Sequence, residues 1–119
     1  MIDPAHLLGT GGALGAVLRY GADRWIPHDR FPFSTALVNI VGSFVLALVV
    51  FADLHPPISL FVGSGACGAF TTYSSFSVQT VRLWETGDRL RAVIYAVGSL
   101  GTCMIAAGLA AMLVAFVGP

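Results

Sequence analysis

The sequence is short of charged residues, and it contains no lysine. Only 10% of its 119 residues are charged, whereas 56% are hydrophobic, and six arginines supply all of the positive charge. A soluble domain usually carries about a quarter charged residues, so this composition excludes an ordinary soluble globular protein. The formal net charge of zero gives no sign of a nucleic-acid partner. A mean hydropathy of +0.84 instead predicts an integral membrane protein.

Three long windows contain no charged residue: residues 31–52, 54–81 and 92–119. Each is at least as long as the ~20 residues that an α-helix needs to cross a bilayer. A fourth window, residues 4–18, reaches that length only by including Arg19 and Tyr20. We therefore predict an all-α integral membrane protein, with one four-helix membrane domain over residues 1–119. Its transmembrane spans are predicted approximately at residues 4–24, 33–52, 57–81 and 91–117.

Signals for secretion, metal binding and catalysis are also scarce. No basic residue precedes the first apolar window, so we expect the first helix to be retained and not removed as a secretory signal. Cys67 and Cys103 fall within charge-free windows, where an apolar thiol usually fills space, so we expect neither a disulfide nor a metal site there. The histidines have no metal-ligand spacing, and no nucleophile lies beside a base. An enzyme is therefore the least expected class.

The arginines are distributed unevenly over the predicted loops. Arg24 and Arg30 flank the first loop and Arg82, Arg89 and Arg91 flank the third, while the second loop and both chain ends carry none. Loops one and three share a side in a four-helix chain, so the positive-inside rule places both in the cytoplasm and both termini outside. We expect an oriented, multi-pass protein of the bacterial inner membrane.

No acidic residue lies in the centre of any span, which excludes the usual carboxylate relay of proton-coupled transporters. The neutral polar residues follow two stripes. In the second span Thr35, Asn39 and Ser43 recur at i, i+4 and i+8, and Tyr95 and Ser99 share a face of the fourth. Such residues can simply join helices by hydrogen bonds, or they can line a wet path.

Small residues and hydroxyls are concentrated in the first and third spans. Gly11 and Gly15 have the four-residue spacing that lets helices pack closely. In the stretch GAFTTYSSF, five hydroxyl side chains follow one another over residues 71–75. They can bond backbone carbonyls and compete with the helical hydrogen bonds, so we predict a break near residues 68–73. Carbonyls freed by a break in lipid must be buried or must coordinate an ion, so the break indicates an ion site.

The residues around the predicted break suit ions of either sign. Carbonyl oxygens suit a hard cation such as Na⁺, whereas amide, hydroxyl and aromatic ring-edge hydrogens suit a small anion. Tyr73 and Phe76 would share a face if the helix resumes after the break. Arg19 is the one charge well inside a span, where it either extends toward loop one or forms a positive vestibule that concentrates anions.

Three stretches resemble the CrcB/Fluc family of fluoride channels: GGALGAVLRY at residues 11–20, STALVNIVGSF at 34–44 and GACGAFTTYSSFS at 65–77. They occur in the family's order and spacing, in a chain of the family's length. The resemblance implies an antiparallel dimer of four-helix subunits that passively exports fluoride from the cytoplasm and so lowers its toxicity.

The resemblance also implies site residues, position by position. Those of the fluoride pathway are Asn39, Tyr73, Phe76, Ser74, Thr35 and Ser99. A structural Na⁺, which is not transported, would be held by the backbone carbonyls of Gly68 and Thr71 of both subunits. Arg19 would lie in the vestibule.

Two features depart from the family's usual pattern. Tyr73 stands where the family usually has phenylalanine. The tyrosine keeps the polarised ring edge and adds an O–H. The uneven distribution of the arginines favours one orientation in the membrane, whereas family members that insert in both orientations need little charge bias between their loops. Some members instead occur as two oppositely oriented chains that pair with each other. We therefore predict pairing with an oppositely oriented homologous subunit, with a homodimer of dual topology as the alternative.

Two other functions fit parts of the sequence. A small four-helix multidrug exporter has a similar size, but that class depends on a glutamate within helix one, and residues 4–22 contain no acidic residue. A non-transporting membrane assembly subunit would use the polar stripes only to join helices.

Overall fold

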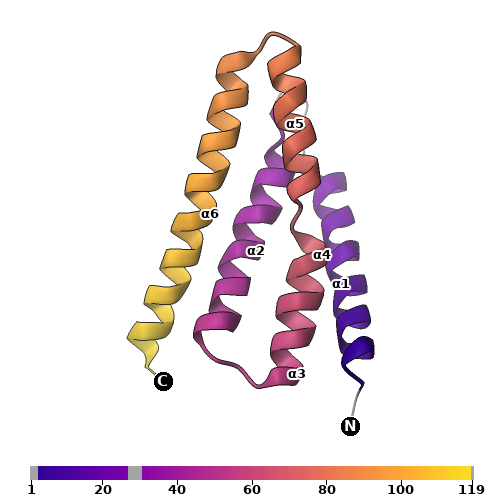
Figure 1. The fold of residues 1–119 in the computed structure, drawn as a ribbon, viewed down its shortest axis with the longest axis vertical. Coiled ribbons are helices and arrows are strands. Elements are labelled where there is room, and N and C mark those ends of the chain that lie inside the picture. Colours follow the sequence, from indigo (N-terminus) through magenta and orange to yellow (C-terminus); the bar gives the residue numbers. More distant parts are fainter. Residues whose placement is uncertain (1–2, 27–30, 119) are drawn as a thin grey trace.

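The computed structural model describes residues 3–26 and 31–118, and within these ranges the chain is helical and has no β-strand. The elements, in chain order, are α1 (Pro4–Trp25), α2 (Phe33–Phe51), α3 (Pro56–Ile58), η1 (Ser59–Cys67), α4 (Gly68–Phe70), α5 (Tyr73–Glu85) and α6 (Arg89–Val117). η1 is a π-helix, and it continues α3 and runs on into α4 without interruption. α1, α2, α6 and the segment that runs from α3 to α5 lie side by side in an elongated bundle (Figure 1).

Three of the four predicted spans correspond to one helix each. Residues 4–24, 33–52 and 91–117 correspond to α1, α2 and α6. The third, residues 57–81, is divided among several elements and continues to Glu85, so the helix includes Arg82, which the sequence had suggested for a loop. The turn between α5 and α6 is therefore short. Gly87 makes this turn with a φ of 91°, a conformation that favours glycine.

Two of the described helices are long and apolar enough to cross a membrane, judged by length and composition. They are α2, with 19 residues and a mean hydropathy of 2.2, and α6, with 29 residues and a mean hydropathy of 2.3. In α1 the glycines and Arg19 lower the mean hydropathy of the helix. The third pass is interrupted at Thr71 and Thr72, so none of its pieces has the required length.

The connections are divided between the two ends of the bundle. The α5–α6 turn lies at one end, while the start of α1, the α2–α3 connection and the end of α6 lie at the other (Figure 1). The end of α1 and the start of α2 lie in the same half as the α5–α6 turn. The helix ends that flank the first connection thus lie in the same half as the third connection (Figure 1), and Arg30 of the orientation argument lies outside the described residues.

α1 packs against η1 through glycines that leave no room for a side chain. A Cβ atom at Gly15 would meet the carbonyl oxygen of Ala66, and one at Gly11 would meet that of Phe61. From the opposite side, a Cβ atom at Gly65 would lie 3.0 Å from the Cα atom of Gly11. The prediction of close packing from the spacing of Gly11 and Gly15 is confirmed.

α2 packs against α6 on one side and against η1 on the other. The side chains of Val38 on α2 and Tyr95 on α6 are each only 1% exposed, and small residues such as Ala92 and Ala110 complete the contact. Many larger apolar side chains face outward, Phe116 among them. This inversion of the usual soluble pattern is the one expected where lipid surrounds the helices.

Candidate ion site at the broken helix

The third pass breaks at Thr71 and Thr72, inside the predicted range of residues 68–73. Thr71 has φ −80° and ψ 161°, and Thr72 has φ −151° and ψ 120°, so both are extended. The Thr71 hydroxyl donates back to the Cys67 carbonyl at 2.9 Å. The Thr72 hydroxyl accepts from the Ser75 amide at 3.1 Å and so caps α5. Local hydroxyl bonds have replaced the helical bonds, as the sequence suggested.

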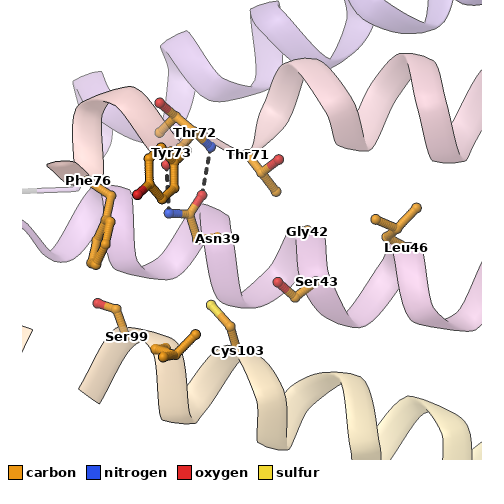
Figure 2. A pocket seen from close by; sticks show the side chains of 11 residues that line it. Asn39, Gly42, Ser43, Leu46, Thr71, Thr72, Tyr73, Phe76, Ser99 and Cys103 are labelled. Carbon is orange, nitrogen blue, oxygen red and sulfur yellow. Dashed lines mark hydrogen bonds between the residues drawn. The ribbon is translucent and has the colours of Figure 1, made fainter. Parts of the chain in front are cut away.

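Asn39 on α2 spans the break by binding both backbone groups of Thr72. Its Oδ1 accepts from the Thr72 amide at 2.7 Å, and its Nδ2 donates to the Thr72 carbonyl at 2.9 Å. Figure 2 shows the two bonds reaching from α2 to the interrupted segment. Most of the side-chain amide is therefore occupied by protein backbone, which the sequence did not reveal.

The break releases backbone carbonyls from the helical pattern, among them those of Gly68 and Thr71. In a continuous α-helix the Gly68 carbonyl would accept from the Thr72 amide, and the Thr71 carbonyl from the Ser75 amide. The Thr72 amide donates to Asn39 instead, and the Ser75 amide donates to the Thr72 hydroxyl. The Gly68 and Thr71 oxygens, which are among those released, belong to the residues predicted to bind Na⁺.

Gly42 on α2 receives the side chain of Thr71. A Cβ atom at Gly42 would meet the Thr71 Cγ2 methyl group. With its methyl in this notch, Thr71 directs its hydroxyl back to the Cys67 carbonyl. Gly42 therefore helps to set the side-chain orientation of Thr71.

A pocket of about 300 Å³ lies beside the break, between α2, α5 and α6 (Figure 2). Its lining residues are Asn39, Gly42, Ser43, Leu46, Thr71, Thr72, Tyr73, Phe76, Ser99, Leu100 and Cys103. Ser99 is only 7% exposed, and its Oγ has no hydrogen-bond partner among the described residues. A buried hydroxyl without a partner is costly, so this one is a candidate ligand for something that enters the pocket.

Aromatic rings continue from the pocket toward the loop-one end. The ring centroids of Tyr73 and Phe76 lie 6.2 Å apart, and those of Phe76 and Tyr95 lie 5.2 Å apart. Tyr73 is 81% exposed, whereas Tyr95 is buried and its hydroxyl donates to Gln79 Oε1 at 2.9 Å. Tyr73 and Phe76 thus share a face, as their spacing predicted.

The structure brings together only some of the predicted site residues. Around the pocket lie Asn39, Thr71, Tyr73, Phe76 and Ser99. The predicted residues that do not line it are Thr35, Gly68, Ser74 and Arg19.

The residues outside the pocket have different environments. Thr35 is 2% exposed and lies against the phenol of Tyr95. Gly68 and Ser74 are exposed. The Ser74 hydroxyl lies 3.3 Å from that of Thr72, close to the break.

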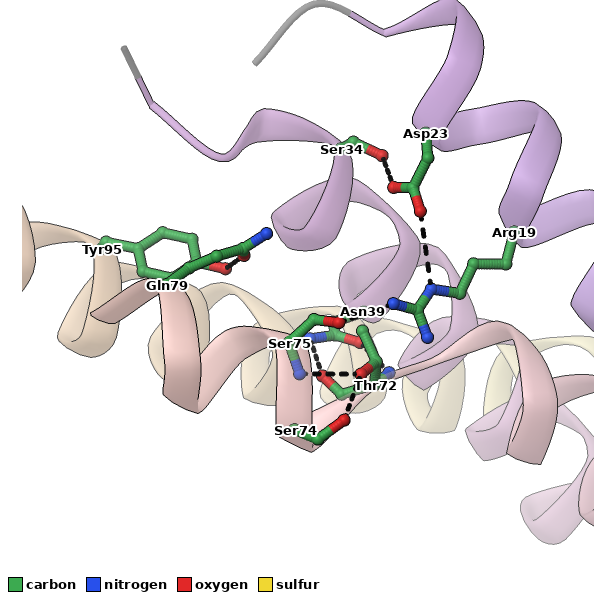
Figure 3. A network of polar contacts seen from close by, with 9 residues as sticks. All are labelled: Arg19, Asp23, Ser34, Asn39, Thr72, Ser74, Ser75, Gln79 and Tyr95. Carbon is green, nitrogen blue, oxygen red and sulfur yellow. Dashed lines mark hydrogen bonds and ion pairs between the residues drawn. The ribbon is translucent and has the colours of Figure 1, made fainter. Parts of the chain in front are cut away.

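Arg19 is engaged in a chain of polar contacts and does not simply extend toward loop one (Figure 3). Its Nη2 donates to Ser75 Oγ on α5 at 2.7 Å, and its Nε lies 3.9 Å from Asp23 Oδ2. The other carboxylate oxygen, Asp23 Oδ1, accepts from Ser34 Oγ at 2.6 Å. The guanidinium is thus placed against the first turn of α5, near the break.

Sequence reasoning did not select several residues of this site. Gly42 and Thr72 shape the break, and Ser43 and Cys103 line the pocket. The stripe that contains Asn39 already pointed to Ser43. For Gly42 no sequence signal identifies Thr71 as its neighbour.

These features define a class: a membrane protein, helical over the described residues, whose third predicted span is interrupted at a polar pocket. Residues 6–112 match the family model described as "CrcB-like protein, Camphor Resistance (CrcB)". The chain is 50% identical over 109 residues to the Haloarcula marismortui protein named "Fluoride-specific ion channel FluC 2", and the match covers 92% of each chain. The chain therefore belongs to the CrcB-like family.

Two further relatives agree in name. A Halobacterium salinarum protein named "Fluoride-specific ion channel FluC 1" is 46% identical over 94% of each chain. A Thermus thermophilus protein named "Fluoride-specific ion channel FluC" is 42% identical over 79% of this chain and 80% of its own. These names describe channels and not enzymes.

Proposed function

We propose that this chain is a subunit of a fluoride-specific channel with four membrane spans, through which fluoride leaves the cytoplasm passively. The observation that carries the proposal is the break at Thr71 and Thr72, which Asn39 holds open beside a pocket. In that pocket the buried Ser99 hydroxyl has no hydrogen-bond partner within the described part of the chain. Irregular backbone at membrane depth is tolerated where it lines a path or binds an ion. The names of the relatives specify which ion.

Hydrogen-bond donors around the pocket would replace the water that fluoride loses. The Ser99 O–H has no acceptor among the residues that the structure describes, and Asn39 Nδ2 keeps a second hydrogen after it has donated to the Thr72 carbonyl. The positive ring edges of Tyr73 and Phe76 would contact the ion directly. Thr35 and Ser74 would extend the path beyond the pocket. Each contact must be strong enough to desolvate fluoride and weak enough to release it.

The released carbonyls would hold a structural Na⁺. The described residues contain no cluster of three His, Cys, Asp or Glu side chains. Carbonyl oxygens, those of Gly68 and Thr71, are therefore the ligands that the break offers to a hard cation. When bound, the ion would be coordinated by these oxygens and would replace their lost hydrogen bonds. It would not be transported.

The channel would be an antiparallel dimer, because residues on both sides of the break are exposed in one subunit. Tyr73 is 81% exposed, and Gly68 and Ser74 are exposed as well. Since freed carbonyls and hydroxyls are unfavourable against lipid, another polypeptide is expected to cover this surface. A second subunit in the opposite orientation would cover it and bring its own Gly68 and Thr71 carbonyls to the cation. The grouped arginines favour a homologous subunit inserted the other way as that partner.

Fluoride efflux from liposomes, followed with a fluoride electrode, tests the proposal. The chain is reconstituted alone and together with a candidate partner subunit, in Na⁺ buffer and in Na⁺-free buffer. We expect efflux with the partner and slower efflux without Na⁺. No efflux under any pairing would refute the channel, and efflux from the chain alone would refute the need for a different partner. Equal efflux in both buffers would contradict the structural Na⁺ but not the channel.

A variant at Phe76 separates a channel from a non-transporting assembly subunit. Phe76→Ile keeps an apolar side chain but removes the polarised ring edge. A channel should lose efflux while the dimer persists on size-exclusion chromatography. An assembly subunit would show no change of flux.

A further inference from the structure

We propose that Asp23 is a positioning residue of the channel, which holds the Arg19 guanidinium against the first turn of α5 and ties that contact to α2. Its expected effect on ion flux rests on the proposed fluoride channel. Its expected effect on the start of α5 rests on the contacts alone. Asp23 itself lines no part of the pocket.

The two carboxylate oxygens of Asp23 have separate partners. Oδ1 accepts from Ser34 Oγ at 2.6 Å, and Ser34 is only 2% exposed. Oδ2 lies 3.9 Å from Arg19 Nε. One oxygen therefore fixes the carboxylate to the start of α2, while the other sets the direction of the guanidinium (Figure 3).

The place that Arg19 occupies is unfavourable for a cation without a counter-charge. Its Nη2 donates to Ser75 Oγ in the first turn of α5. The N-terminal turn of a helix carries partial positive charge, which repels a guanidinium. Asp23 supplies the opposing charge one helical turn away on α1. The Arg19 side chain is 25% exposed and the Asp23 side chain 45% exposed. Water therefore screens this pair only in part.

The contact of Arg19 with Ser75 is linked to the pocket. The Ser75 amide donates to Thr72 Oγ1, and both backbone groups of Thr72 are bound to Asn39. Thr72 and Asn39 line the pocket. A displaced Arg19 would therefore loosen the cap of α5 and the break that Asn39 spans.

Asp23→Asn is the informative substitution, because asparagine can still accept from Ser34 but carries no charge. We expect it to slow fluoride efflux roughly tenfold, the effect of losing one charge-assisted interaction. Asp88→Asn is the matched control: Asp88 pairs with Arg91 at 3.3 Å, away from the break. It should leave efflux unchanged.

Two readouts separate positioning from a general structural role. If Asp23 acts through Arg19, the double variant with Arg19→Gln should be no slower than Arg19→Gln alone. Hydrogen–deuterium exchange of the peptide that begins α5 should rise in both single variants and stay constant in Asp88→Asn. Additive losses of flux, or unchanged exchange at the start of α5, would overturn the proposal.

The failures of the two proposals are distinguishable. If the unmodified protein conducts, and Asp23→Asn alters neither flux nor exchange, Asp23 is not a positioning residue and the channel stands. If the unmodified protein never conducts, the channel fails, and the exchange comparison alone decides for or against Asp23. If Asp23→Asn does not fold, Ser34→Ala replaces it, because it removes only the tether to α2. The same exchange pattern is then expected, and its absence counts against the proposal.

Discussion

The third pass is closed on one side and open on the other. Toward α1, backbone meets backbone at Gly11 and Gly15, and no space remains. Toward α2 and α6, a pocket of about 300 Å³ remains, and the Ser99 hydroxyl there has no partner among the described residues. Small residues and hydroxyls both occur as helix-joining residues in membranes. A small residue or hydroxyl that already contacts a neighbouring helix joins the two helices, whereas one that faces open space is available to a ligand.

The largest effect is expected on the closed side, from Gly15→Leu. The new side chain would meet the carbonyl oxygen of Ala66, which as part of a helix backbone cannot move aside. We expect the free energy of unfolding to fall by roughly 3 kcal/mol or more, a large fraction of the roughly 5–15 kcal/mol that stabilises a typical folded protein. Thermal unfolding and the yield on size-exclusion chromatography measure it. Gly98→Ala is the control, because a Cβ atom at Gly98 has nothing within 4 Å. Equal melting of Gly15→Leu and the unmodified protein would show that the face is not closed.

The next effect is expected where the open side is held in shape, from Asn39→Ala. This variant leaves the Thr72 amide and carbonyl unpaired, and each unpaired group costs about 1–3 kcal/mol. We expect lower stability together with a large fall in fluoride efflux. The stability of Asn39→Asp should lie between those of the unmodified protein and Asn39→Ala, because an ionised aspartate can accept from the Thr72 amide but cannot donate to its carbonyl. Unaltered efflux in Asn39→Ala would mean that the break does not depend on this side chain.

A smaller effect is expected from Gly42→Ala, which closes the notch that receives Thr71. The added methyl would meet Thr71 Cγ2 and force the side chain to turn. We expect the free energy of unfolding to fall by about 1–2 kcal/mol, and fluoride efflux to become slower. Thr71→Ser in the same chain should restore both stability and efflux, because serine lacks the interfering methyl and keeps the hydroxyl. The absence of rescue would show that the contact is not the cause.

The smallest effect on stability is expected from Ser99→Ala. Removing a buried hydroxyl without a partner should leave the unfolding free energy unchanged or raise it by up to about 1 kcal/mol. Efflux should nevertheless fall, because a donor in the pocket is lost. Melting and efflux measured on one preparation test this divergence. A fall in both would indicate that the hydroxyl joins helices like other residues of its kind.

Much of the helical arrangement could be predicted from the sequence, because lipid allows few alternatives. Charge-free windows must satisfy their backbone groups internally, so they form helices at nearly the predicted positions. The break could also be predicted, because five consecutive hydroxyl side chains compete with helical bonds. The π-helical form of η1 was not predicted, since nothing in its sequence distinguishes it from an α-helix.

The site could be predicted only in part, because its roles depend on contacts between distant segments. Thr35 and Asn39 lie on one stripe of α2, yet Thr35 is buried against Tyr95 while Asn39 binds Thr72. Arg19 and Ser75 are 56 residues apart in sequence, so their contact has no local signal. The side-chain stripes indicated where to look, and the packing of the helices determined what each residue does.

The length of α6 has a consequence for the surrounding bilayer. Its charge-free part, residues 92–117, extends about 39 Å at 1.5 Å per residue, against a hydrocarbon core of about 30 Å. The apolar surface of α6 therefore exceeds what an upright helix can immerse, and tilting or local thickening of the bilayer must take up the difference. Lipids with longer acyl chains should accordingly suit this protein better than short-chain lipids, which would force α6 to lean further and strain its contact with α2.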